Sequence, residues 1–566
     1  MQPLTSAMTT IRRSLLAALK SLLRGKSFLQ ALFAFWISPK TIQEHNHANG
    51  KMIEPPRSID EFLREAEERL LGPTEGDRLR QFSSDLKAQF RERLHTHAEC
   101  MLPSFNHLLP TGQEKGQYLA LDVGGSTLRV ALVELRGREA SGRESEIVRM
   151  ISFKITPEIK KLEGMGFFDW MAARIHEVIH KDVSQTQQDV PIPMGLAWSF
   201  PVEQVSLGGG LLLGMGKGFL ATNGLLGQDL GEIIKFACEQ RNLNVQLAAI
   251  INDSSATLLS QAYIHAETRF GLILGTGTNI AVHLPVSALG RPKYGQRPES
   301  WFRSASHVIV NTELGMFGRD ILPLTRWDEL LKATHPRPEF QPLEHLLSGF
   351  YLGEICRLAL VEAVETTGLL GGELPPSLAA PYSLDTELLS RIEADTTPTP
   401  TSAISAFTSA HPSPSPSSTS PSTTPYTPTP NDLSAIRTLA VYITRRSAAI
   451  LAASVFALWE LRHETEAEYL AATPAVNGNV PLLDSTRAEH ALPATKVAFN
   501  GSVIEHYPGY RARCQGYIDG LVAGSVVDGV GGGRGSVELV PALESSILGA
   551  AVALGCAVAQ EGYRYV

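Results

Sequence analysis

Cysteine is scarce in this sequence. Five cysteines occur in 566 residues, far apart and never in a C-x-x-C pair: Cys100, Cys238, Cys356, Cys514 and Cys556. An odd number without paired spacing fits neither a disulfide framework nor a zinc site. The pattern predicts a reducing compartment, so we expect a cytoplasmic protein.

A strong excess of charge of one sign is also missing. The formal net charge is −8, the sequence pI is about 6.1, and 19% of the residues are charged. Because a nucleic-acid footprint requires a basic excess, no nucleic-acid partner is expected.

The length of the chain exceeds the size at which one hydrophobic core keeps growing, about 250–300 residues. At least two lobes with a cleft between them are therefore predicted.

Acidic residues are absent from positions 1–43, where six basic residues occur: Arg12, Arg13, Lys20, Arg24, Lys26 and Lys40. This asymmetry is typical of a targeting signal. The apolar run at 28–37 is too short to cross a bilayer as a helix. Three interpretations stay open for residues 1–51: an address with peripheral mitochondrial or membrane contact through residues 1–40, an extension upstream of a working start at Met52, or a helix docked on the fold.

The apolar pattern predicts helices first and strands later. Between 59 and 109 apolar side chains recur every three or four residues, whereas from Gln117 onward the period is two. Strands are expected at 118–122, 128–134, 194–198, 248–251, 270–274, 308–310 and 497–499, and further helices at 343–367 and 436–462. The fold class is therefore α/β with two lobes.

Between Asp395 and Asp432 the chain is rich in Thr, Ser and Pro and contains no charged residue. Such a segment buries too little apolar surface to offset the entropy of ordering, so a disordered surface insertion is predicted over 395–432. Residues 471–492 and the glycine run at 529–535 are interpreted as two more loop insertions. No internal repeat is evident.

The common phosphate-binding motifs are missing. The Gly-Lys-Ser at 25–27 has Lys20 where a Walker A loop requires glycine, and no G-x-G-x-x-G follows a strand. Three other glycine turns follow strands, at 124–127, 275–277 and 501–502. Backbone N–H groups in such turns can approach phosphate oxygens, and Asp122 at a strand end can hold Mg²⁺ through water. Together the turns predict one nucleotide site in a cleft.

A carboxylate comes directly after an apolar strand at Asn252-Asp253. Phosphoryl transfer requires a carboxylate to accept the hydroxyl proton, cations to spread charge, and accurate placement of the reactants. Asp253 is therefore a candidate catalytic base. The alternative is that Asp253 only caps the helix that follows it.

In order along the chain, these motifs resemble those of the hexokinase family, from about residue 59 to 555. The matched segments are the phosphate turn at 122–129, Ser199-Phe200-Pro201, the lysine segment at 216–219, Asn252-Asp253, Gly-Thr-Gly-x-Asn at 275–279, Asn-x-Glu at 311–313, Glu344, and the adenosine segment at 501–503. The resemblance implies a two-lobed, actin-like ATPase fold with a ligand cleft between a small and a large domain.

The resemblance also implies an enzyme that uses ATP and Mg²⁺ to phosphorylate the C6 hydroxyl of a hexose, working as a monomer. The implied catalytic residues are Asp253, Lys217 and Arg129. The implied sugar-binding residues are Ser199, Phe200, Lys217, Asn252, Asp253, Asn279, Glu313 and Glu344. The implied nucleotide-binding residues are Asp122, Gly124, Gly125, Ser126, Thr127, Arg129, Gly275, Thr276, Gly277, Gly501, Ser502 and Ser546, with Asp122 holding Mg²⁺ through water.

Several positions depart from the usual family pattern. The replaced positions are Ser126-Thr127 in the phosphate turn, Trp198 before Ser199, Gly216 before the lysine, Leu314 after Glu313, and Glu544-Ser545-Ser546-Ile547. The residues at these positions resemble those of the fungal N-acetylglucosamine kinase branch of the family. Gly216 would leave room for an N-acetyl group. N-acetylglucosamine is therefore the expected acceptor. Glucose or a broad hexose range, and a non-catalytic sugar-sensing regulator, are the alternatives.

The expected parts follow the same resemblance. They are an N-terminal extension at 1–51, helices that pack on the large domain at 52–111, a small domain at 112–252, a large domain at 253–541 that carries the 395–432 insertion, and a C-terminal helix at 542–566 that returns to the small domain.

Overall fold

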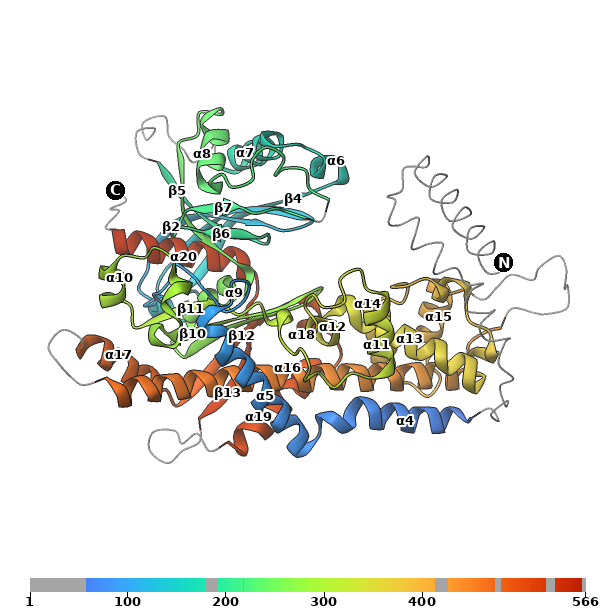
Figure 1. Ribbon diagram of the computed structural model, residues 1–566. Coiled ribbons are helices and arrows are strands. Elements are labelled where there is room, and N and C mark those ends of the chain that lie inside the picture. The colour runs from blue at the N-terminus through green and yellow to red at the C-terminus, as the bar shows by residue number, and fades with distance from the viewer. Residues whose placement is uncertain are drawn as a thin grey trace, which may run out of the picture. The chain divides into compact units, whose positions relative to one another are not determined.

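Residues 57–179, 191–216, 218–412, 426–473, 480–525 and 535–561 are described by the computed structural model of the protein (Figure 1). The chain divides into two units, Met1–Ser58 and Ile59–Val566, and every element below belongs to the second. The N-terminal extension, with its predicted membrane contact, lies outside the described residues.

Strands and helices alternate along the unit. The strands are β1 (Leu102–Pro103), β2 (Gly116–Val123), β3 (Thr127–Leu135), β4 (Ser145–Lys154), β5 (Ile192–Trp198), β6 (Val202–Gln204), β7 (Gly210–Leu212), β8 (Val245–Ile251), β9 (Thr268–Leu274), β10 (Thr278–Pro285), β11 (His307–Asn311), β12 (Ala494–Asn500) and β13 (Ser536–Pro541). The helices are α4 (Ile59–Leu71), α5 (Gly76–Thr96), α6 (Pro157–Lys160), α7 (Met165–Ile179), α8 (Leu230–Glu239), α9 (Asp253–Ile264), α10 (Glu299–Ser304), α11 (Arg326–Thr334), α12 (Glu344–Leu347), α13 (Gly349–Thr367), α14 (Thr386–Ala394), α15 (Thr401–Ala410), α16 (Pro430–Ala472), α17 (Val480–His490), α18 (Ser502–His506), α19 (Tyr510–Ala523) and α20 (Ser545–Glu561).

The two large sheets share one topology. The first has the order β4-β3-β2-β5-β8, in which β2, β3 and β4 pair antiparallel while β5 and β8 run parallel to β2. The second has the order β1-β11-β10-β9-β12-β13, in which β9, β10 and β11 pair antiparallel while β12 and β13 run parallel to β9. The predicted α/β class is confirmed, and the structure adds a topological repeat that the sequence does not reveal.

Helices α9 and α20 lie between the two sheets, and glycine permits the close approaches. A Cβ at Gly271 of β9 would lie 2.1 Å from the Ser254 carbonyl oxygen of α9, and one at Gly549 of α20 would lie 2.2 Å from the Ala256 carbonyl oxygen. On the far side of α20, a Cβ at Gly195 of β5 would lie 2.2 Å from the Ala550 carbonyl oxygen. Each contact needs a residue without a side chain, so the layers pack backbone to backbone.

Helix α16 organises the core around the second sheet. It packs against α4, α5, α13, α14 and α19, and α5 and α16 cross in Figure 1. Within the described residues α16 is the one helix long and apolar enough to cross a membrane, but 83% of its most apolar window is buried inside the protein. The burial makes it a core helix of the unit.

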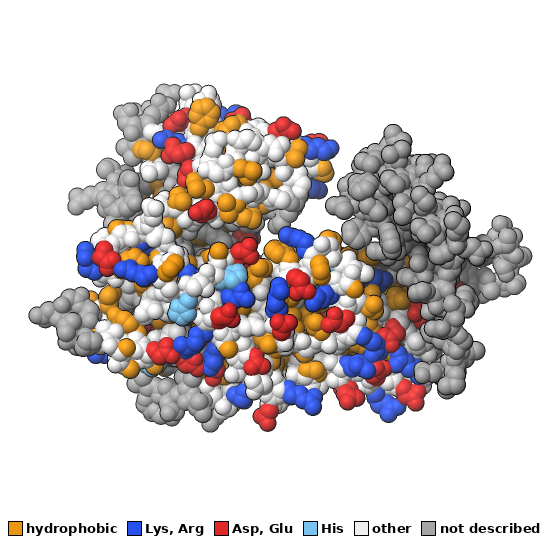
Figure 2. Space-filling view, in the orientation of Figure 1, with side chains coloured by type: hydrophobic (Ala, Val, Ile, Leu, Met, Phe, Trp, Pro, Cys, Tyr) orange, Lys and Arg blue, Asp and Glu red, His pale blue; other side chains and the backbone are white. Residues whose placement is uncertain are grey.

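Helices α7 and α8 cover the other face of the first sheet, above the strands in Figure 1. On the face shown in Figure 2, acidic and basic side chains are interspersed over the described part of the surface. Arg326 forms ion pairs with Glu65 and Glu362 at 2.6 and 2.7 Å.

Most predicted elements are present. The strands predicted around 118–134, 194–198, 248–251, 270–274, 308–310 and 497–499 are confirmed as β2, β3, β5, β8, β9, β11 and β12. The helical pattern predicted over 59–109, however, extends too far. Helix α5 ends at Thr96, and β1 joins the second sheet by pairing with β11. The division of the chain into parts ending at 51, 111, 252 and 541 stays a prediction.

Two predicted insertions are wrong in part. Residues 401–410 form α15, with Ala403, Ala406 and Phe407 buried, although they lie within the tract predicted to be disordered. The apolar side chains recur at helical spacing inside a Ser- and Thr-rich composition. Likewise, the tract at 471–492 is largely helix α17, which buries Leu483 and Thr486. Residues 413–425 and most of the glycine run at 529–535 lie outside the described residues.

Candidate active site

The first glycine turn closes the hairpin between β2 and β3. Antiparallel pairing places Asp122 opposite Arg129, and the Gly124 N–H donates to the Thr127 carbonyl oxygen at 3.0 Å. Gly125 lies at the tip with Ser126, whose side chain is exposed. The predicted phosphate-turn residues are therefore together, with backbone and hydroxyl groups open to a ligand.

Three ionisable side chains meet beside this turn. Arg129 Nε donates to Asp122 Oδ2 at 2.8 Å, and Arg129 Nη1 donates to Glu544 Oε2 at 2.6 Å. Asp122 is 7% exposed. Burial raises the pKa of Asp122 to about 6 against the lowering effect of Arg129, and the nearby Asp253 carboxylate adds to the rise. Arg129 thus lies between two carboxylates, and a third is close enough to act on Asp122.

Sequence reasoning did not place Glu544 in the site. Glu544 has a φ of 49° immediately before α20. The sequence did contain one signal for it. Glu544 is the acidic first residue of the segment 544–547, which replaces the family's Asp-Gly-Ser-Gly. Ser546, which was predicted, is half-buried in the first turn of α20, next to Ser545, whose hydroxyl lies 2.9 Å from that of Thr257 in α9.

The candidate base lies at the junction of β8 and α9. Asn252 is the N-cap of α9, because its Oδ1 accepts from the Ser255 N–H at 2.8 Å. The cap role considered for Asp253 therefore belongs to its neighbour. Ser199, which follows β5, donates its hydroxyl to both Asp253 oxygens, at 3.0 and 2.9 Å. The structure thus brings together Ser199, Asn252 and Asp253 at the ends of two adjacent parallel strands.

A second polar group lies on the other sheet. Asn279 Nδ2 donates to Asn311 Oδ1 at 2.8 Å, and Asn311 Nδ2 donates to Glu313 Oε1 at 2.7 Å. Asn279 Oδ1 accepts from the Ile280 N–H at 2.8 Å. Glu313 has a left-handed φ of 53°, and burial raises its pKa. Asn311 is a second residue absent from the predicted site, although the Asn-x-Glu spacing contained it.

Glu344 connects this group to the second glycine turn. Its Oε2 accepts from the Thr278 N–H at 2.9 Å and would lie 2.9 Å from a Cβ at Gly277. The Gly275 N–H donates to the Gly277 carbonyl oxygen at 3.0 Å, which leaves Thr276 exposed at the tip. Glu344, a predicted sugar-binding residue, therefore contacts the predicted phosphate turn at 275–277.

The second and third glycine turns are adjacent. A Cβ at Gly501 would lie 2.4 Å from the Leu274 carbonyl oxygen, and one at Gly275 would lie 3.4 Å from the Ser502 backbone nitrogen. Gly501 has a φ of 127°, which a residue with a side chain rarely adopts. The structure thus places 275–277 beside 501–502, as one nucleotide site requires.

Phe200 and Lys217 are the two predicted sugar-binding residues outside the polar contacts described above. Phe200 is buried, with ring centroids 5.2 Å from Trp198 and 5.1 Å from Phe219, so its ring packs in the apolar core between the first sheet and helices α7 and α8. Lys217 lies outside the described residues. Its neighbour Gly216 has a φ of 58°.

Comparison with known proteins agrees with this arrangement. Two family models, both described as hexokinase, match residues 67–263 and 269–556. Hexokinase-1 of Nicotiana tabacum is 32% identical over 357 residues, which cover 62% of this chain and 69% of that protein. Hexokinase of Schwanniomyces occidentalis is 29% identical over 364 residues, which cover 63% and 73%.

Solved structures show the same fold. The hexokinase from Schistosoma mansoni complexed with glucose aligns with a TM-score of 0.66 at 24% identity, covering 88% of this chain and 100% of that one. Fold and site together define a hexokinase-type phosphotransferase built on two large sheets. The chain belongs to the hexokinase family, whose members transfer phosphoryl groups to sugar hydroxyls.

Proposed function

We propose that the protein transfers the γ-phosphoryl group of ATP to the C6 hydroxyl of glucose or of a broader range of hexoses. Family membership supports the reaction class, and the relatives named above are all hexokinases. The observation that carries the proposal within the site is the pair Ser199–Asp253, in which a hydroxyl orients a carboxylate at a strand end.

In the proposed reaction, Asp253 accepts the proton of the sugar hydroxyl as the oxygen attacks the γ-phosphorus in line. The O–H bond breaks, a bond from oxygen to the γ-phosphorus forms, and the bond to the β-phosphate oxygen breaks to release ADP. Because this chemistry depends on placement, the hydrogen bond from Ser199 matters for aiming the carboxylate.

Sugar recognition would come from the polar groups described above. Asn279, Asn311 and Glu313 are linked by hydrogen bonds, so their side chains are held before a ligand arrives. A preorganised set of buried polar groups selects a hydroxyl pattern, because a ligand that leaves one unpaired costs about 1–3 kcal/mol. Glu344 and Ser199 would complete the set.

The residues beside the first turn fit a divalent cation. Asp122, Asp253 and Glu544 are three carboxylates accompanied there by Arg129, and the raised pKa of Asp122 reflects burial among these groups. Carboxylate oxygens are the ligands that Mg²⁺ accepts, often through water. Asp122 is the residue proposed to hold Mg²⁺, and bound Mg²⁺ would neutralise charge on the phosphates of ATP. Lys217 and Arg129 are proposed to add positive charge at the same place.

N-acetylglucosamine remains a second candidate acceptor because of one observation. Gly216 is exposed, and a Cβ there would have no described neighbour within 4 Å, so the solvent side of this glycine is open. None of the relatives named above carries N-acetylglucosamine in its name, and the resemblance to that branch has no support from them. Glucose is therefore the main candidate and N-acetylglucosamine the comparison.

The test is ADP release by the full chain with glucose, N-acetylglucosamine, glucosamine or no sugar. We expect the highest kcat/KM with glucose and a fall in kcat of about 10²–10⁴-fold in Asp253→Asn, because the base is removed. Asp519→Asn, at an exposed position of α19, is the matched control and should keep full turnover. Sugar binding without turnover in the wild type would instead indicate a sugar-sensing regulator.

A further inference from the structure

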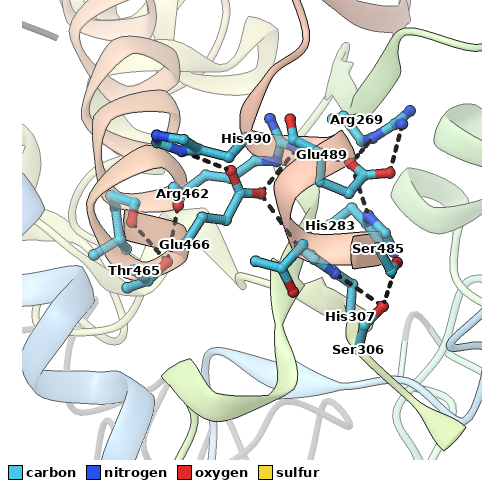
Figure 3. A network of polar contacts seen from close by, with 12 residues as sticks. Arg269, His283, Ser306, His307, Arg462, Thr465, Glu466, Ser485, Glu489 and His490 are labelled. Carbon is cyan, nitrogen blue, oxygen red and sulfur yellow. Dashed lines mark hydrogen bonds and ion pairs between the residues drawn. The ribbon is translucent and has the colours of Figure 1, made fainter. Parts of the chain in front are cut away.

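A buried polar network lies away from the candidate active site, where the end of α16 and helix α17 meet the second sheet (Figure 3). Its two carboxylates are Glu466 of α16 and Glu489 of α17. Glu489 accepts from Arg269 Nη2 at 2.7 Å and from Arg462 Nη2 at 2.8 Å. The network thus brings two carboxylates together with two guanidinium groups, those of Arg269 and Arg462.

Three side chains of this network face one another: His463, Glu466 and His490. One potential ligand atom from each lies within 4.8 Å of the others. His463 and Glu466 are three residues apart on α16, a spacing that places two side chains on one helix face and recurs in metal sites of helical bundles. His490 is the last residue of α17. Two helices thus contribute two imidazoles and one carboxylate to one point.

Two of the facing atoms contact only each other among the described residues. Glu466 Oε2 and His490 Nδ1 are both buried and lie 3.5 Å apart, an ion-pair distance drawn as a dashed line in Figure 3 but beyond the usual range of an N–H···O hydrogen bond. The Glu466 side chain is 0% exposed. Leaving such groups unsatisfied is costly, so a ligand between them would be stabilising. Two atoms that each lie about 2.0–2.1 Å from a tetrahedral Zn²⁺ are roughly 3.4 Å apart, close to the observed spacing.

The other oxygen of Glu466 is already held. Glu466 Oε1 forms an ion pair with Arg462 Nη2 at 2.9 Å and lies 3.3 Å from His307 Nε2. Contacts of this kind orient a metal-binding carboxylate and leave the second oxygen to bind as a single ligand. The His490 side chain is 26% exposed, so the cluster lies close to the protein surface.

We propose that His463, Glu466 and His490 bind a divalent transition-metal cation, most naturally Zn²⁺. Two neutral imidazoles and one carboxylate are a ligand set typical of zinc, with a fourth position for water. The ion would fasten α17 to α16 and, through His307, to β11. The competing arrangement is an ion pair in which a protonated His490 faces Glu466 without any metal.

The test measures zinc itself, independently of kinase activity. The full chain is desalted and titrated with Zn²⁺ against a chromophoric chelator, its metal content is determined by mass spectrometry, and Co²⁺ is substituted to record ligand-field absorption. We expect one Zn²⁺ per chain, an intense tetrahedral Co²⁺ spectrum and a higher melting temperature with Zn²⁺. His463→Gln and His490→Gln should each weaken binding more than about 100-fold, beyond the effect typical of an outer-shell residue.

Matched variants distinguish zinc bound by these three residues from zinc bound elsewhere on the chain. His283→Gln removes a histidine of the same network that is not one of the three and should leave one zinc bound. Cys100→Ser controls for zinc bound at a thiol and an imidazole elsewhere in the described residues, because Cys100 Sγ lies 3.2 Å from His97 Nδ1. Asp253→Asn should keep zinc binding although turnover is lost. Equal zinc affinity in the wild type and both ligand variants, or a wild type without zinc binding and without the Co²⁺ spectrum, would overturn the proposal in favour of the ion pair.

Discussion

At the scale of single residues, the hydrogen bonds of Ser199 make the first prediction. Its hydroxyl is the described donor to both Asp253 oxygens. In Ser199→Ala we expect kcat/KM for the hexose to fall about 10–100-fold, because a hydrogen bond to a charged group contributes about 1.5–3 kcal/mol. Steady-state kinetics measure the change. The control is Ser304→Ala, because the Ser304 hydroxyl is exposed and donates to the nearby Trp301 carbonyl oxygen. Unchanged kcat/KM in Ser199→Ala would remove Ser199 from the mechanism.

Asp122 makes a prediction about pH. Its folded-state pKa of about 6 lies above the ordinary 3.8, because the site is buried. The folded protein therefore binds this proton more tightly than the unfolded chain, so the contribution of Asp122 to stability is largest below pH 3.8 and is lost as pH rises through 6. Without Mg²⁺ and ATP, the unfolding free energy of the wild type relative to Asp122→Asn should fall by about 2 kcal/mol between pH 4 and pH 7. Urea unfolding at a series of pH values checks this, and a difference independent of pH would contradict it.

Sequence motifs predicted most residues of the candidate site but not how they are paired. The sequence predicted Asn252 and Asp253 as one motif but did not distinguish their roles. The structure shows that Asn252 caps α9, whereas Asp253 accepts a hydrogen bond from Ser199. The pair Arg129–Glu544 joins residues 415 positions apart. No local pattern predicts such a contact, because it depends on α20 returning to the first sheet.

At the scale of elements, the approach of two glycine turns makes a sharp prediction. Gly501→Ala forces a side chain into a φ of 127° and places its Cβ 2.4 Å from the Leu274 carbonyl oxygen. We expect a loss of about 1–3 kcal/mol in unfolding free energy and a higher KM for ATP, because the turn at 275–277 must shift. Gly516→Ala in α19, where a Cβ meets no atom of the described residues within 4 Å, is the control and should stabilise the protein by about 0.5–1 kcal/mol. Equal KM values for ATP in both variants would argue against a nucleotide site here.

Elements with strong periodicity were predictable, whereas composition was misleading. The strands β5, β8, β9 and β12 follow from short apolar runs. Helix α15 was missed because a Ser-, Thr- and Pro-rich tract was judged by its average, although Phe407 and its apolar neighbours bury one helical face. Helix α17 was missed in the same way, and with it the position of Glu489 and His490. Burial against a distant partner decides such segments, and composition does not contain that information.

At the scale of the whole molecule, the sequence shows no repeat, yet both large sheets have the same order of antiparallel and parallel strands. The order and direction of strands depend on backbone hydrogen bonds, which many different amino-acid sequences can form. A repeated topology therefore does not require a repeated sequence. The two copies contribute different parts of the candidate site. Ser199 follows a strand of the first sheet, while Asn279 and Asn311 belong to strands of the second.

This division predicts closure when sugar binds. A hexose that makes hydrogen bonds to Ser199 and Asp253 on one side and to Asn279 and Glu313 on the other is bound most tightly when the two groups approach, and closure would exclude water from the transfer. Saturating glucose should therefore lower the radius of gyration measured by small-angle X-ray scattering. In Glu313→Gln, which keeps the size of the side chain but removes its charge, the decrease should require a higher glucose concentration. If calorimetry shows glucose bound while the radius of gyration stays constant, the two groups do not close on the sugar and the site must already be assembled in the free protein.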